Sequence, residues 1–65
     1  MSKYPEITVK LTGKDGNAFA VMGAVRRALK QADVSADEVD EYTKQSTSGD
    51  YDNLLQVAMS WVTVI

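Results

Sequence analysis

One segment near the start of the chain alternates apolar and polar residues, and the strand that it predicts needs a pairing partner. In residues 6–11, EITVKL, the apolar side chains Ile7, Val9 and Leu11 take every second position. This period of two, rich in β-branched residues, predicts a half-buried strand. Because a lone strand leaves its backbone groups unpaired, we expect it to pair with a second strand of the chain or with another copy.

The first of three expected helices spans residues 18–32. Its apolar side chains recur at helical spacing, and Phe19, Met22 and Leu29 are expected to cover the strand. Basic residues gather toward its C-terminal end, where the helix dipole favours positive charge. This segment is therefore expected to provide the first apolar layer over the strand.

The second expected helix spans residues 36–45. Ser35 is followed three residues later by Glu38, which is the spacing of a capping box. Acidic residues crowd the first turn, where the positive end of the helix dipole stabilises them. Apart from a few inward positions the segment is polar, so we expect its stability to come from packing.

The third expected helix spans residues 51–61, and the tail after it is ambiguous. Gly49 is expected to be a left-handed turn residue and Asp50 an N-cap. Residues 62–65, VTVI, fit either a last helical turn or a short strand, because so short an apolar run has no decisive period. A strand here would be one partner for residues 6–11.

The predicted architecture is a compact α+β domain spanning residues 1–65, with an N-terminal strand, three helices and an undecided tail. A chain of 65 residues buries only about 60% of the surface that it exposes when unfolded, so it is marginally stable alone. With no cysteine it has no disulfide to stabilise it. We therefore expect a homodimer.

Charge is divided unevenly along the chain. Residues 1–30 hold six basic and two acidic side chains, a net +4, whereas residues 31–65 hold one basic and seven acidic, a net −6. Such asymmetry indicates either an interaction surface or two halves that neutralise each other. The candidate interface residues, drawn from the strand, the acidic helix and the C-terminal end, are Ile7, Val9, Asp37, Glu41 and Trp61.

The turn between the strand and the first helix has two interpretations. Gly13, Lys14, Gly16 and Asn17 precede a helix N-terminus, which is the setting of an anion or nucleotide site. The spacing is not that of a P-loop, and Asp-Gly-Asn is also common in ordinary turns. A tight corner is the favoured interpretation, and a phosphorylated ligand is the alternative.

Composition argues against most chemistry. There is no histidine and no cysteine, so the commonest metal ligands and nucleophiles are missing. Asp50 and Asp52 lack the other positions of a calcium loop. We predict no metal, no cofactor and no enzymatic activity. Few basic residues, an acidic balance and no long apolar run also argue against nucleic acid and membrane partners, and no signal peptide is evident.

Two segments resemble a known group of proteins. LTGKDGNAFAVMGAVRRAL and SGDYDNLLQVAMSWV are similar to a small family of bacterial and phage proteins of unknown function, with the pattern TG-x-DGNAFA followed by SGDYD. The pattern covers most of the chain. The family carries no established activity, so the resemblance implies no catalytic residue. It implies a bacterial or prophage setting and a recurring pair of glycine turns.

The functional prediction is a small cytoplasmic interaction protein, for example a phage or prophage accessory factor. Its expected partners are a second copy of itself and a host protein. The alternative is a binder of a phosphorylated small molecule or nucleotide at residues 13–17 and the helix that follows.

Overall fold

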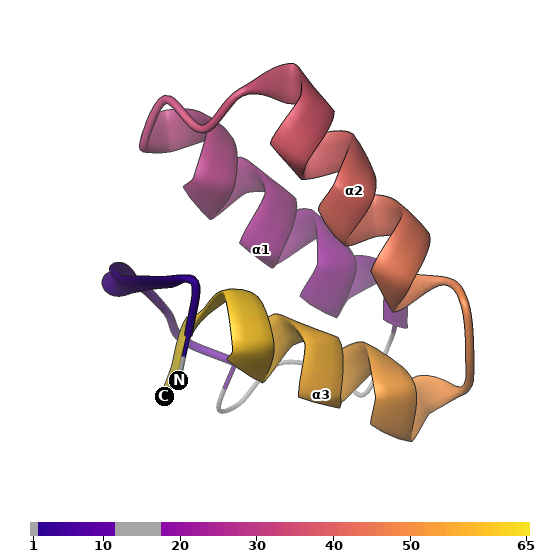
Figure 1. Cartoon of the computed structure of the whole chain (residues 1–65). Coiled ribbons are helices and arrows are strands. Elements are labelled where there is room, and N and C mark those ends of the chain that lie inside the picture. Colours follow the sequence, from indigo (N-terminus) through magenta and orange to yellow (C-terminus); the bar gives the residue numbers. More distant parts are fainter. Residues whose placement is uncertain (1, 12–17) are drawn as a thin grey trace.

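The fold of the chain is given by a computed structural model that describes residues 2–11 and 18–65. The elements are, in chain order, β1 (Tyr4–Val9), α1 (Ala18–Gln31), α2 (Ala36–Ser46), α3 (Tyr51–Trp61) and β2 (Val62–Val64). Helices α1 and α2 lie side by side as a hairpin, and α3 lies across one side of the pair (Figure 1). The two strands and both ends of the chain gather at one end of α3 (Figure 1). The predicted α+β architecture is confirmed.

The ambiguous tail is a strand, and it pairs with β1 in parallel within the same chain. Ile65 N–H donates to the Val9 carbonyl at 3.0 Å, and Leu11 N–H donates to the Ile65 carbonyl at 2.9 Å. The register is irregular between Tyr4 and Thr8. The observed strand begins two residues before the predicted one, and it ends at Val9 although the backbone of Leu11 still bonds the tail. The backbone of residues 6–11 thus finds its partner inside the chain.

The core combines side chains from both strands and all three helices, and the sheet lies at one edge of it. Its buried members are Ile7, Val9, Val25, Leu29, Val39, Tyr42, Ala58, Trp61 and Val62. Because the strands are short, most of this core is formed where α2 and α3 meet α1. The N-terminal segment is held against β2 at this edge of the core, since the Ser2 hydroxyl donates to the Val62 carbonyl at 3.0 Å.

Helix α1 buries Leu29 as predicted, but the first residue of its inward face differs from the predicted one. Val21, Val25 and Leu29, spaced four residues apart, are buried, and Met22 is half-buried. The prediction that Phe19 covers the strand is wrong, because 79% of its surface is exposed. Phe19 lies in the first turn, where the helix faces the α2–α3 turn rather than the sheet, so the Val21 position takes the inward direction.

The N-caps of α2 and α3 are the two residues that the sequence predicted. Ser35 Oγ accepts from Glu38 N–H at 3.3 Å, and Asp50 Oδ1 accepts from Asn53 N–H at 3.0 Å. Helix α2 ends at Ser46 and α1 at Gln31, each one residue from the predicted end. Both predicted N-caps are confirmed.

The expected left-handed conformation of Gly49 is wrong, and close approach explains its glycine instead. A Cβ atom at this position would lie 2.9 Å from the Cβ of Asn53. The Asn53 amide donates to the Gln45 carbonyl at 3.0 Å, so it holds the end of α2 against the start of α3. Asn53 leaves no room for a side chain at Gly49.

The left-handed residue is Asp33, which ends α1 with φ of 62°. Val34 N–H donates to the Leu29 carbonyl at 3.0 Å, which is the bond that closes a Schellman motif. Glycine is the residue that adopts this conformation at least steric cost. We therefore expect Asp33→Gly to raise stability by about 0.5–1 kcal/mol, measured by thermal denaturation.

The matched control for Asp33→Gly is Asp37→Gly on the exposed side of α2. There the same replacement should lower stability by about 0.5–1 kcal/mol, since glycine has a low helix propensity and the first turn also loses a carboxylate that the helix dipole stabilises. A lower melting temperature for Asp33→Gly than for the unmodified chain would contradict the motif.

Candidate functional site

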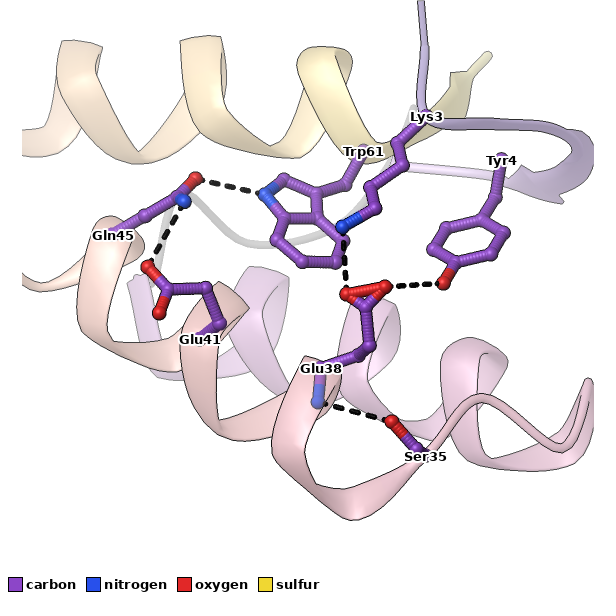
Figure 2. A network of polar contacts seen from close by, with 7 residues as sticks. All are labelled: Lys3, Tyr4, Ser35, Glu38, Glu41, Gln45 and Trp61. Carbon is purple, nitrogen blue, oxygen red and sulfur yellow. Dashed lines mark hydrogen bonds and ion pairs between the residues drawn. The ribbon is translucent and has the colours of Figure 1, made fainter.

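A cluster of aromatic and polar side chains surrounds Trp61 at the end of α3 (Figure 2). The Tyr4 ring stacks on Trp61 with centroids 6.2 Å apart, and the Tyr42 ring meets it edge-on at 5.8 Å. The indole Nε1–H donates to Gln45 Oε1 at 2.9 Å, and the Gln45 amide in turn donates to Glu41 at 3.1 Å. Trp61 therefore joins β1, α2 and α3, with its one polar group satisfied.

The Glu38 carboxylate receives two donors from the N-terminal segment (Figure 2). Lys3 Nζ lies 2.6 Å from its Oε2, and the Tyr4 hydroxyl donates to its Oε1 at 2.8 Å. The Lys3 ammonium also lies 4.5 Å from the centroid of the Trp61 ring, within the range of a cation–π interaction. An exposed ion pair contributes little alone, but this one shares its groups with two rings and two chain segments.

The electrostatics of this cluster favour structure over acid–base chemistry. The Lys3 ammonium, and after it the Tyr4 hydroxyl, lower the pKa of Glu38 below its ordinary value of 4.5. The hydrogen bond to Glu38 raises the pKa of Lys3 and the pKa of Tyr4. Burial raises the pKa of Tyr42, which the nearby Ser46 hydroxyl and Arg26 partly offset. All four groups thereby keep their ordinary ionisation states at neutral pH, and Lys3, Tyr4 and Glu38 serve as fixed donors and acceptors.

The lowered pKa of Glu38 predicts a loss of stability in acid. Its folded pKa is below the unfolded one, so its contribution is present above about pH 4.5 and is lost as the pH falls through the folded pKa. Glu38→Gln should therefore flatten the acid limb of melting temperature against pH and lower the melting temperature at neutral pH.

The matched control for this pH scan is Asp40→Asn, on an exposed position of the same helix. The acid limb of this variant should keep the slope of the unmodified chain. Equal flattening in both variants would show that acid sensitivity comes from general charge and not from the Glu38 contacts.

The surface charges of the α1–α2 hairpin form a second feature. Among the described residues Lys3 and Glu38 form the only ion pair, and the charged side chains of the hairpin's outer side form none. These side chains are Arg26, Arg27 and Lys30 on α1 and, on α2, Asp37, Asp40 and Glu41 together with one basic residue, Lys44. The charges of α1 and α2 thus lie side by side without direct ion pairs, and the Lys3–Glu38 pair is the contact through which the basic and acidic halves neutralise each other among the described residues.

A hollow of about 370 Å³ separates the basic and acidic residues on this face. Its walls carry Arg26 and Lys30 from α1, Asp33 from the connecting turn and Asp40 from α2, and Val34 and Val39 also line it. Arg26 is half-buried, and its Nε has no hydrogen-bond partner among the described residues. The hollow is therefore a polar groove over a partly apolar base, with opposite charges on its two sides.

A third feature is a more apolar hollow of about 290 Å³ between the first turn of α1 and the α2–α3 turn. Phe19, Met22, Tyr51 and Leu54 line it. Phe19 and Tyr51 are both exposed there. This apolar hollow shares no lining residue with the charged groove between Arg26 and Asp40.

The predicted interface residues do not form one surface in the structure. Ile7, Val9 and Trp61 lie in the core of the chain itself, whereas Asp37 and Glu41 are exposed on α2. The anion site predicted at Gly13, Lys14, Gly16 and Asn17 lies outside the described residues. Of the five candidate interface residues, those on α2 are the ones that a partner can touch directly.

Several residues of these features escaped the sequence analysis. Lys3, Tyr4 and Gln45 gave no signal, because each acts through a partner far away in the chain. The groove between Arg26 and Asp40 could not be predicted from the sequence either, although the uneven charge of the two halves indicated which helices carry its charged side chains.

Comparisons with protein-family models, curated proteins and solved structures found no match for this chain. The resemblance to bacterial and phage proteins stays a prediction. No described helix is long and apolar enough to cross a membrane. In the same described ranges, no three acidic side chains lie together as a metal site would require.

Proposed function

We propose that this chain is a small non-enzymatic protein that works by binding other proteins through the outer face of the α1–α2 hairpin. We define this charged face as Arg26, Arg27, Lys30, Asp37 and Asp40. The single observation that carries the proposal is the separation of charge on this face without internal ion pairs. Opposite potentials arranged on one surface steer a partner and fix its orientation.

Two further properties support a binding role. The chain has no histidine or cysteine, and the ionisable groups around Trp61 keep their ordinary charge states through fixed contacts. A 65-residue domain also gains stability from association, because its own core is small. We place its action in the cytoplasm, and a phage or prophage accessory factor that binds a host protein is the setting that the sequence resemblance implies.

Site-specific photo-crosslinking in the native cell tests this function. A photoreactive amino acid at position 23 would project from α1 beside Arg26 and Arg27, where a Cβ meets no atom within 4 Å. The control places the same group at Met59, which is exposed on α3. We expect protein adducts from position 23 and few from position 59. Equal adducts from both positions, or none from position 23, would contradict the proposal.

A further inference from the structure

We propose that the partner of the charged face is a second copy of this chain, docked across a two-fold axis that runs along the groove between α1 and α2. This inference rests on the proposed function and names the occupant of the same face. The argument for the second copy is the order of the charges along the two helices.

The charges of the two helices come in matching levels. Helices α1 and α2 run in opposite directions as a hairpin (Figure 1), so Lys30 near the end of α1 and Asp37 near the start of α2 both lie close to their connecting turn. About one helical turn further from that connection follow Arg26 on α1 and Asp40 on α2. Arg26, Lys30 and Asp40 all border one hollow, so the level of Arg26 and Asp40 spans the groove. Asp37 lies beside Asp40 in the adjacent hollow on the outer side of α2.

Only two-fold axes parallel to the helices bring opposite charges of the two copies together at every level. An axis parallel to the helices places α1 of each copy over α2 of the other and keeps the levels aligned. Lys30 of one copy then opposes Asp37 of the other, and Arg26 opposes Asp40. An axis across the helices would place α1 over α1 and α2 over α2, which opposes like charges and is costly. A closed dimer follows, since a two-fold contact uses the same patch on both copies.

Two observations favour a second copy over an unrelated protein. The face contains both members of each complementary pair, so one surface suffices for both sides of the contact. The net charge of the chain is only −2, so repulsion between copies is weak. Pairing through β1 is not needed, because β2 already occupies one edge of that strand within the chain.

Charge exchange between two variants tests this dimer. The first variant carries Arg26→Glu and Lys30→Glu, and the second carries Asp37→Lys and Asp40→Lys. Mass is measured by light scattering at about 1 mM chain and low ionic strength, where screening is weakest. We expect the unmodified chain to be dimeric and each variant alone to bind itself at least about tenfold more weakly. An equimolar mixture should restore the dimer, because both halves of the contact then pair opposite charges.

The controls are Asp52→Lys, which changes charge in the first turn of α3 as Asp37→Lys does in α2, and Lys10→Glu beyond β1. Both should remain dimeric, and circular dichroism should show all variants folded. A monomeric unmodified chain, dimers that survive either reversal, or a mixture that fails to assemble would each overturn the proposal. Assemblies larger than a dimer in the mixture would overturn the two-fold. If the chain is monomeric but position 23 crosslinks to another protein, the binding function stands while self-pairing fails.

Discussion

Trp61→Ala should unfold most of the protein at room temperature. The indole is almost fully buried, and it contacts Tyr4, Tyr42, Lys3 and Gln45 at the junction of β1, α2 and α3. Replacing a buried tryptophan by alanine costs about 3–5 kcal/mol. A core of this size rarely supplies more than about 3–5 kcal/mol of total stability. We expect the cooperative transition in circular dichroism to be lost or to move below room temperature.

Two controls separate the indole's packing from its hydrogen bond. Met59→Ala, on an exposed position of the same helix, should change stability by less than about 0.5 kcal/mol. Trp61→Phe keeps an aromatic ring and loses the bond to Gln45, so it should cost less than the alanine variant. A Trp61→Ala protein that melts like the unmodified chain would show that the aromatic cluster does not hold the fold together.

Deleting residues 62–65 should be the second most damaging change. It removes the strand that pairs with β1 and takes away Val62, which is fully buried. Burial of one such side chain contributes about 1.5–3 kcal/mol. The backbone bonds of Val9 and Leu11 to Ile65 would be lost as well. We expect a loss of at least about 3 kcal/mol in urea denaturation, enough to leave this small domain largely unfolded.

The control for this truncation keeps the strand and changes one exposed side chain. Ile65→Ser retains the backbone groups that bond Val9 and Leu11, while its side chain is 58% exposed in the unmodified protein. Stability should fall only slightly. If the truncated chain kept its full cooperative transition, β2 would contribute little to the fold.

Local signals in the sequence were sufficient to predict β1 and the three helices. The alternation of Ile7 and Val9 predicted β1, and the spacing of Ser35 and Glu38 predicted the start of α2, because both patterns depend only on neighbouring residues. Phe19 shows the limit of such reasoning. Phe19 does lie in the predicted helix. In the folded chain, however, Val21 is the buried side chain of this turn, and Phe19 is exposed.

Contacts distant in sequence could not be predicted, because they depend on how the elements assemble. Nothing local distinguishes the pairing of β2 with β1 from a last helical turn, since VTVI is too short to show a period. The links from Lys3 to Glu38 and from Trp61 to Gln45 join segments on different elements. The charged face was predictable only as uneven charge, and its alignment across the groove required the hairpin geometry.

The most direct test of the account is a dilution series followed by amide chemical shifts in nuclear magnetic resonance spectra. As the chain concentration rises at low salt, the amide signals of Arg26, Lys30, Asp37 and Asp40 should move together along one binding curve. Signals of the sheet, such as that of Thr63, should stay fixed. Shifts confined to the sheet, or no shifts up to about 1 mM at low ionic strength, would contradict the assignment of the charged face as the surface through which two copies associate.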